Sequence, residues 1–354
     1  MTEITHVLEQ FGICADAAPH GNGHINRTYL VESSPRVILQ RINTDVFHRP
    51  GEVMSNIFGV TTFLRKKIEE AGGDPNRETL NFLKTKEGLP YYTDDSGCYR
   101  AYYFVEDTIS PEAAETPEEF AEAAHAFGRF QRMLADFPAE NLYETIELFH
   151  DTENRYRQFE QALKENRSGR ADSVSEEIEF ALSHRKYASL ITSAIKEGTV
   201  PVRVTHNDTK LNNVLLDSAT KKGICVIDLD MVMPGSMLYD FGDALRFGAS
   251  TAAEDEKDLD KVHFDLAKFE AFVKAFLEEL GDDITQKERE LLPVSALIMT
   301  LECGTRFLTD HLNGDIYFGI HRENHNLDRC RTQYKLVAEM EALLPKMAEI
   351  VAKY

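Results

Sequence analysis

Three polar residues in the middle of the chain have the types and the spacing for chemistry on a phosphate group. The stretch "THNDTKLNNVLLD" places Asp208 and Asn213 five residues apart, and Asp228 follows fifteen residues later in "ICVIDLD". Carboxylate and carboxamide oxygens are ligands that the hard ion Mg²⁺ prefers. A positioned carboxylate can also accept the proton of an attacking hydroxyl. We therefore predict that Asp208 is a general base and that Asn213 and Asp228 are metal ligands.

The order of these residues matches that in protein kinases, which carry a catalytic aspartate, then an asparagine, then a metal-binding aspartate. The literal letters Asp-Phe-Gly occur at Asp240, but this residue lies thirty-two positions after Asp208, too far for a metal ligand that follows one loop and one hairpin. We assign the metal to Asp228. Asp240 is interpreted as a helix N-cap or a brace for the catalytic loop, which His206 also braces.

The motif "HNDTKLNN" followed by "VIDLD" resembles the aminoglycoside phosphotransferase and choline kinase superfamily, which has a protein-kinase-like fold. Four longer stretches are similar to one group within it, the N-acetylhexosamine 1-kinases of sugar salvage: "GNGHINRTYLV", "RVILQRINT", "IDLDMVMPGSMLYDFGDALRFGAS" and "ECGTRFLTDHLNGDIYF". The resemblance implies transfer of a phosphoryl group from ATP, with Mg²⁺, to the anomeric hydroxyl of N-acetylglucosamine or N-acetylgalactosamine.

The same resemblance implies roles for individual residues. Asp208 would face the sugar O1, Asn213 and Asp228 would bind magnesium, and Asp230 would be a second carboxylate near the metal. The sugar pocket would be lined by three further side chains: His24, Phe247 and Arg306. The stretch "YYFVE" would be the hinge that offers backbone groups to adenine, with Tyr103 and Val105 as the contacts.

The glycine-containing turn "GNGHIN" is predicted to approach the nucleotide phosphates. Gly21 and Gly23 are present, but Asn26 stands where a third glycine is expected. The strand "RVILQRI" has Gln40 where a protein kinase carries its phosphate-holding lysine. The sugar kinases that this chain resembles also have glutamine at this position. Arg41 is adjacent, but alternation along a strand directs it to the opposite face. The residue type that contacts the phosphates is therefore an open question.

Three other functions are weighed against this one. The acceptor could be an amino alcohol or an aminoglycoside, although a cationic acceptor favours an acidic pocket, whereas Arg306 and His24 suit a neutral, hydroxyl-rich one. A two-metal phosphohydrolase could use four ligands: His206, Asp208, Asp228 and Asp230. Such sites draw on clustered histidines, and the twelve histidines here are dispersed. A non-catalytic pseudokinase is disfavoured because the base and the metal ligands are all present.

The elements that must position these residues predict an α+β, bilobal, protein-kinase-like fold. Residues 1–106 read as a small antiparallel β lobe that binds the nucleotide, with one main helix at about residues 52–71. Strands are predicted at "RTYLVES", "RVILQRI", "TLNFLKT", "PYYT" and "YRAYYFVE". Residues 107–354 read as a larger helical lobe with the catalytic loop, the metal site and the sugar pocket. The active site is expected in the cleft between the two lobes.

Capping residues predict several of the helices in the larger part. Thr116, Pro117 and Glu119 indicate an N-terminus with a capping box, and Thr285 with Glu288 indicates another. One helix is expected from about residue 173 to just before Gly198, and a final one from about residue 326 to the end. The runs "NNVLLD" and "ICVIDLD" are predicted to form a β-hairpin.

Composition excludes some classes of partner. The net charge of −21 argues against nucleic acid and against anionic lipid. We find no signal peptide in the first residues and expect no apolar stretch long enough to span a bilayer. Five scattered cysteines indicate reduced thiols and a cytoplasmic protein. The expected partners are a small sugar and a nucleotide, and the oligomeric state is left open, with a monomer as the default.

Overall fold

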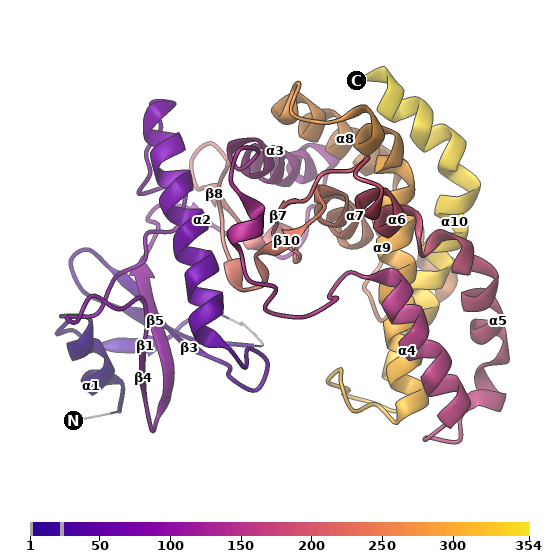
Figure 1. The fold of residues 1–354 in the computed structure, drawn as a ribbon, viewed down its shortest axis with the longest axis horizontal. Coiled ribbons are helices and arrows are strands. Elements are labelled where there is room, and N and C mark those ends of the chain that lie inside the picture. Colours follow the sequence, from indigo (N-terminus) through magenta and orange to yellow (C-terminus); the bar gives the residue numbers. More distant parts are fainter. Residues whose placement is uncertain (1–2, 22–24) are drawn as a thin grey trace.

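The computed structural model describes residues 3–21 and 25–354, and its amino-terminal part is built on one antiparallel sheet (Figure 1). The strands stand in the order β1-β2-β3-β5-β4 and have these bounds: β1 Ala17–Pro19, β2 Arg27–Val31, β3 Val37–Ile42, β4 Tyr92–Asp94 and β5 Gly97–Tyr103. Two helices accompany the sheet, α1 (Glu3–Gln10) and α2 (Pro50–Glu70). The α+β class predicted from the sequence is confirmed.

The two faces of this sheet bury different side chains. Leu39 of β3 and Tyr99 of β5 point to one face, where they pack with Val7 and Leu8 of α1 in a small separate core. Because side chains alternate along a strand, the neighbours of Leu39 and Tyr99 point to the other face. That opposite face therefore carries Gln40 and Arg100 of the paired strands β3 and β5, side by side in register.

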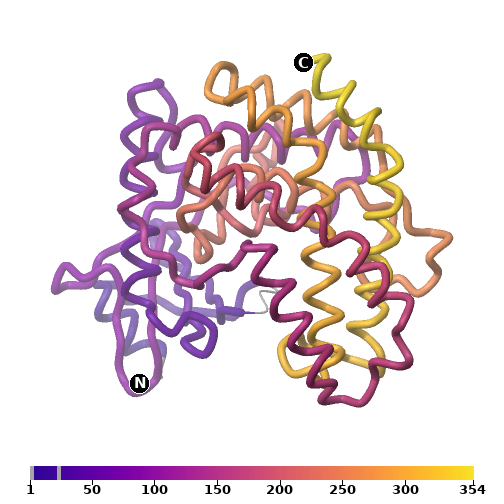
Figure 2. The backbone as a smooth tube through the Cα atoms, turned by 45° about the vertical axis from the view of Figure 1, so that its right-hand side comes forward, coloured from indigo at the N-terminus to yellow at the C-terminus, as the bar shows by residue number. Residues whose placement is uncertain are grey.

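The remainder of the chain is mainly helical, and its core is continuous with the α2 side of the sheet. Its helices are α3 Pro117–Met133, α4 Thr152–Glu165, α5 Ser175–His184, α6 Leu190–Lys196, α7 Met237–Gly248, α8 Leu266–Leu280, α9 Gln286–Asn313 and α10 His325–Lys353. Helices α9 and α10 lie side by side in both views (Figures 1 and 2). The proposed division of the chain at residues 106 and 107 stays a prediction.

Two small sheets interrupt these helices and hold the loops that matter for chemistry. One pairs β7 (Arg203–Thr205) with β10 (Met233–Gly235). The other has the order β6-β8-β9, with β6 at Thr108–Ile109, β8 at Val214–Asp217 and β9 at Gly223–Val226. Strands β8 and β9 form the antiparallel hairpin that the sequence predicts.

Two predicted elements differ from those observed. The run "TLNFLKT" is not a strand, and it forms a single bridge, Phe82 to Tyr102, because β4 takes the adjoining part of the same edge of β5. The long helix expected from residue 173 is divided into α5 and α6 by a turn at Arg185–Tyr187. In that turn Lys186 and Tyr187 both contact Glu341 of α10, so tertiary contacts override the helical pattern.

Helix termini follow the capping prediction with one change. Thr285 and Glu288 form a complete capping box at α9. At α3, Thr116 accepts the backbone N–H of Glu119, but the Glu119 carboxylate accepts from the N–H of Glu115 instead of the cap residue.

The expectation that no stretch is long and apolar enough to cross a bilayer is wrong for α9. An 18-residue window of this helix passes that test, and 83% of the window is buried inside the fold. Burial in the core of a folded protein accounts for such a composition.

Candidate active site

The catalytic loop connects β7 to β8 and brings Asp208 and Asn213 together. Asn213 Nδ2 donates to the main-chain O of Asp208 at 2.8 Å and to its Oδ2 at 3.0 Å. The Lys210 ammonium lies 2.8 Å from Asp208 Oδ1. Both carboxylate oxygens of Asp208 therefore have a donor that fixes their direction. Asn213 keeps its carbonyl oxygen for another ligand, because only its amide nitrogen is used by Asp208.

The buried carboxylate of Asp240 in α7 holds the first residues of this loop by hydrogen bonds. This carboxylate accepts from the backbone N–H groups of His206 and Asn207 and from Gln131 Nε2 at 2.7 Å. Burial raises the pKa of Asp240 above its usual value, and the hydrogen bonds oppose that shift. Asp240 is thus a brace, and the alternative interpretation as N-cap is wrong because Ser236 caps α7.

His206 braces the same loop from its other side, as the sequence predicts. Its ring is fully buried, and Nε2 lies 2.8 Å from the carbonyl oxygen of Ile227, next to Asp228. This contact ties the catalytic loop to the end of β9.

Asp228 follows β9 in a left-handed backbone conformation, with φ 58° and ψ 57°. Such a conformation is uncommon for a non-glycine residue, and Asp is among those that tolerate it. The residue is exposed at the surface of the site. Neighbouring protein atoms still displace water from its carboxyl group, and this desolvation raises its pKa to about 6, with a further contribution from Asp230 and Asp208. A carboxylate whose charge is disfavoured in this way suits a divalent cation. A Mg²⁺ ion fits the free oxygens of Asp228 and Asn213, and these metal roles stay predictions.

Asp230 is engaged differently from Asp228. One of its oxygens pairs with Arg100 Nη1, and the other accepts from Asn26 Nδ2 at 2.5 Å. Arg100 Nε in turn donates to Gln40 Oε1 at 2.9 Å, and Gln40 Nε2 donates to Thr28 at 3.1 Å. The chain of contacts joins β2, β3 and β5 to the segment after β9. Among the described residues, no group of three or more His, Cys, Asp or Glu side chains is arranged to hold a metal.

Phe247, at the end of α7, lies near Lys210, which is the ion-pair partner of Asp208. The Lys210 ammonium and the Arg246 guanidinium each lie 6.0 Å from the Phe247 ring centre. Arg246 pairs with Asp243 of its own helix and with Glu254, so its charge is compensated. The ring lines a hollow of ≈ 320 Å³ together with Leu211 of the catalytic loop.

Arg306 lies in the middle of α9, on a different hollow. Its guanidinium sits between two aromatic rings, 5.3 Å from the centre of Phe149 and 5.5 Å from that of Phe318. The groove it lines has a volume of ≈ 570 Å³ and includes Arg155 and Tyr317. Phe247 and Arg306 thus line two separate hollows in the structure, and their shared role in a sugar pocket stays a prediction.

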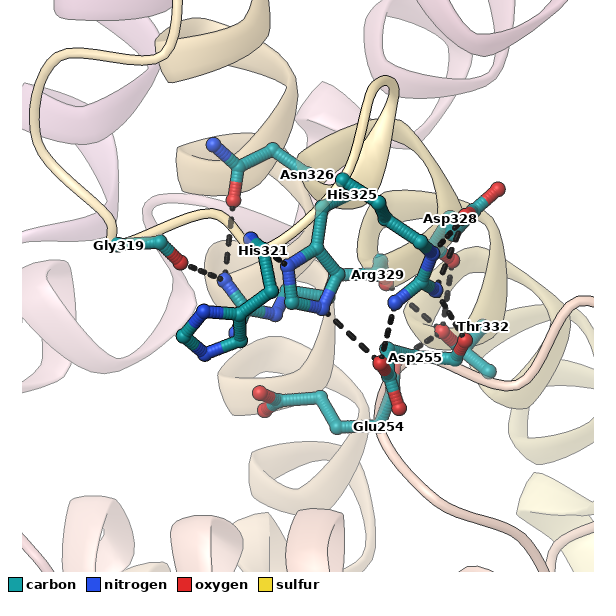
Figure 3. A network of polar contacts seen from close by, with 10 residues as sticks. Glu254, Asp255, Gly319, His321, His325, Asn326, Asp328, Arg329 and Thr332 are labelled. Carbon is teal, nitrogen blue, oxygen red and sulfur yellow. Dashed lines mark hydrogen bonds and ion pairs between the residues drawn. The ribbon is translucent and has the colours of Figure 1, made fainter.

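The segment that carries Phe318 is fixed by Asp310. Its carboxylate accepts the backbone N–H groups of residues 316–318 at 2.9–3.0 Å and a further bond from Asn326. The next residues join a polar network at the start of α10 (Figure 3). There His325 Nε2 and Arg322 Nη1 both contact Asp255 Oδ2, at 2.9 and 2.7 Å. The segment that lines the groove at residues 316–318 is thus held by Asp310, and the residues that follow it are held by Asp255.

The remaining predicted contacts are spread along the sheet. His24 and Gly23 lie outside the described residues, and Gly21 has the positive φ of 73° that glycine favours. The N–H of Tyr103 donates to Asn81 and the carbonyl of Val105 accepts from Thr108, so those two groups are already used. Adenine contact at Tyr103 and Val105 stays a prediction.

Comparison with known proteins agrees with this arrangement. The sequence model of the phosphotransferase enzyme family matches residues 16–280, about three quarters of the chain. The chain belongs to this phosphotransferase family. The match covers the glycine-containing turn, the catalytic loop, Asp228 and α7, and it ends at the last residue of α8.

Solved structures show the same fold over nearly the whole phosphotransferase. A microcompartment-associated aminopropanol kinase has a TM-score of 0.66 and 17% identity, with 98% of each chain covered. An aminoglycoside phosphotransferase from Alicyclobacillus acidocaldarius has a TM-score of 0.64 and 14% identity, covering 99% of this chain and 96% of that one. A spectinomycin phosphotransferase with ADP and spectinomycin has a TM-score of 0.58 and 12% identity, covering 97% and 98%. At these identities the likeness shows the fold, which is the kinase-like fold predicted.

Two contributors to the site of this phosphotransferase are not among the residues predicted from the sequence. Arg100 was missed because it lies on β5, remote in sequence from every motif, although a lone arginine among the tyrosines of "CYRAYYF" is a signal for a buried, paired charge. Lys210 stands inside the catalytic motif itself. Its spacing of two from Asp208 places both on one loop, and this could have suggested their ion pair.

Proposed function

We propose that this phosphotransferase is an N-acetylhexosamine 1-kinase. It transfers the γ-phosphoryl group of ATP, with Mg²⁺, to the anomeric hydroxyl of N-acetylglucosamine or N-acetylgalactosamine. The observation that carries the kinase chemistry is the Asp208 carboxylate, fixed by Asn213 and Lys210 on the loop next to Asp228. The sugar acceptor is supported by the long stretches that resemble sugar 1-kinases.

The reaction needs a base, charge neutralisation and alignment. Asp208 takes the proton from the sugar O1 as the bond from O1 to the γ-phosphorus forms and the bond from that phosphorus to the β-γ bridging oxygen breaks, which releases ADP. Asn213 and Asp228 would hold the magnesium ion, which supplies neutralisation of phosphate charge. Lys210 holds the Asp208 carboxylate in place. Positioning of this kind supplies much of the acceleration in phosphoryl transfer.

The side chains around the base suit a neutral acceptor. The Phe247 ring offers an aromatic wall, and the chain has no tryptophan to take that part. The cations Lys210 and Arg246 that flank this ring are both paired with carboxylates, so they add no net charge beside it. Arg306 and Arg155 line a separate groove. His24 is retained in the proposed sugar site on the resemblance alone.

A metal-dependent phosphohydrolase has less support. It would need His206 and Asp230 as metal ligands, but His206 contacts the Ile227 carbonyl in the core and Asp230 is paired with Arg100. The proposed setting is the cytoplasm, supported by five cysteines that are all free thiols in the structure.

Acceptor-dependent ADP release tests the proposal. The purified protein is incubated with ATP and Mg²⁺ and with each of these acceptors: N-acetylglucosamine, N-acetylgalactosamine, aminopropanol, ethanolamine, choline, spectinomycin and homoserine. We expect release with the two sugars and none with their methyl glycosides, whose anomeric oxygen is blocked. Phosphorus–proton coupling to the anomeric proton would identify the 1-phosphate. Turnover of an amino alcohol without turnover of either sugar would replace this acceptor with the alternative.

The base assignment makes a separate prediction. Asp208→Asn removes the proton acceptor but keeps the shape, so kcat should fall by about 10²–10⁴-fold. The affinity for ADP should stay within a few-fold, because the nucleotide does not need this carboxylate. Retention of more than a tenth of the wild-type kcat would refute the assignment.

A further inference from the structure

The protein kinase arrangement around the nucleotide phosphates is incomplete in this chain. Kinases hold the phosphates with a lysine on β3, which pairs with a glutamate on the helix packed behind it. Here β3 has Gln40 at that position. On α2 the buried polar side chains are Thr61 and Asn56, and Asn56 donates to the carbonyls of Val232 and Tyr143. Glu52 of this helix pairs with Arg49. Neither member of the lysine–glutamate pair is supplied by its usual element.

A different pair occupies the neighbouring position. Arg100 lies directly opposite Gln40 in the β3–β5 register, on the same face of the sheet. Its guanidinium pairs with Asp230, and both side chains are only 3% exposed. Asp230 stands two residues after Asp228, so this pair adjoins the proposed metal ligand. The charge missing from β3 is present one strand away.

The neighbours of Arg100 leave its Nη2 without a hydrogen-bond partner among the described residues. Within the described residues, Nε donates to Gln40 and Nη1 to Asp230. An arginine has five N–H donors in a planar fork that matches phosphate oxygens. Gln40 is held in turn by Thr28, so the orientation of Arg100 is fixed from both ends.

We propose that Arg100 is the cation that holds the nucleotide phosphates in place of the β3 lysine, with Asp230 as its orienting carboxylate and Gln40 as its support. The proposal rests on the use of a nucleotide by this phosphotransferase family and not on the identity of the acceptor. The charge is supplied by β5, and its anionic partner by the segment after Asp228. Asn26 donates to the other oxygen of Asp230, so Asn26 must move before a phosphate can contact Arg100.

Binding of ADP and of adenosine, measured by calorimetry without any acceptor, tests this. Arg100→Gln should weaken ADP binding by about ten- to a hundredfold, the range for one lost charge-assisted contact. Adenosine has no phosphate, so its affinity should stay within about twofold of the wild type. Arg41→Gln is the matched control, because it removes a charge from the opposite face of β3 and should change neither affinity. Unchanged ADP binding, or an equal loss of ADP and adenosine binding, would overturn the proposal.

Two further variants protect the test against misfolding. Arg100→Gln leaves Asp230 buried without its partner, so Arg100→Gln/Asp230→Asn removes both charges and should show the same selective loss of ADP binding. Gln40→Lys added to Arg100→Gln returns a cation to the adjoining position in register and should recover part of the ADP affinity. No recovery would show that a charge at this place does not hold the phosphates. A failed sugar assay would leave all these binding results standing.

Discussion

At the scale of single residues, the site is governed by how closely its carboxylates are gathered. Asp228 lies near both Asp208 and Asp230, and its pKa is raised to about 6 by burial and by these two neighbours. Arg100 opposes part of this effect, because it pairs with Asp230. Ionisation of Asp228 is therefore less favourable than that of a free carboxyl group, and a bound cation would offset this cost, which couples metal affinity to the folded structure.

Asp228→Asn should expose this coupling. Without metal the variant removes a repelling charge, so its melting temperature should rise, by no more than about 3 °C because solvent screens an accessible side chain. The further rise that Mg²⁺ with ADP gives the wild type should be lost. Asp172→Asn, which alters an exposed carboxylate on another part of the surface, should show neither effect. An unchanged response to Mg²⁺ in Asp228→Asn would contradict the metal assignment.

The sequence could predict residues whose roles depend on local spacing. Asp208, Asn213 and Asp228 lie on one loop and one hairpin, so their proximity follows from short separations. Of the two interpretations of Asp240, as N-cap or as brace, the brace is observed, and its distance from Asp208 had excluded a metal role. The Arg100–Asp230 pair spans 130 positions and depends on strand register. No local pattern fixes a contact of that kind.

At the scale of elements, the close packing of α7 against α9 sets the geometry below the catalytic loop. Gly242 of α7 allows this approach, since an added Cβ would lie 2.5 Å from Met299 Cγ and 2.5 Å from the backbone oxygen of Ser295. The backbone atom cannot move away without shifting α9. Helix α7 carries both Asp240 and Phe247, so its position affects the loop and the ring together.

Gly242→Ala should therefore lower the free energy of unfolding by about 1–3 kcal/mol, the usual cost of overpacking. It should also reduce kcat, because the brace at Asp240 moves with the helix. Gly319→Ala is the control: no atom lies within 4 Å of its added Cβ, and its φ is not positive, so the change should stay within about 0.5 kcal/mol. Urea denaturation of both variants measures the difference. Equal stabilities would show that α7 and α9 have room between them.

Element boundaries could be predicted where caps are local and could not where tertiary contacts decide. The Thr285 capping box was predicted from four letters of sequence and is observed. The turn between α5 and α6 depends on contacts with Glu341, more than 150 residues later. The sequence also could not show that the Arg306 guanidinium lies between the rings of Phe149 and Phe318, which are remote from it in the chain.

At the scale of the whole molecule, the polar network at the start of α10 joins segments that are distant in the sequence, and it contributes to the stability of the fold. His325 accepts the N–H of His321 at Nδ1, so its proton is on Nε2, which donates to Asp255. Burial lowers the pKa of His325, and the nearby cations Arg329 and Arg322 add to the shift, while Asp255 opposes it. The folded protein thus takes up this proton less readily than the unfolded chain.

This difference predicts a pH dependence with a definite sign. As the pH falls below the ordinary histidine value of about 6.5, the unfolded chain gains a proton that the folded one resists, so stability decreases. His325→Gln removes this group, and its melting temperature should fall less between pH 7 and pH 5 than that of the wild type. Identical slopes for His325→Gln and the wild type would contradict the assignment.

The place of Arg100 on β5 has a consequence for chemical labelling. Reagents that report on kinases by acylating an amine beside the phosphates need a lysine on β3, and Gln40 offers none. A guanidinium that stays protonated is a poor nucleophile. Such a reagent would find Lys210, the amine paired with Asp208. A survey with reagents designed around the usual lysine would therefore either label Lys210 or leave this protein unlabelled.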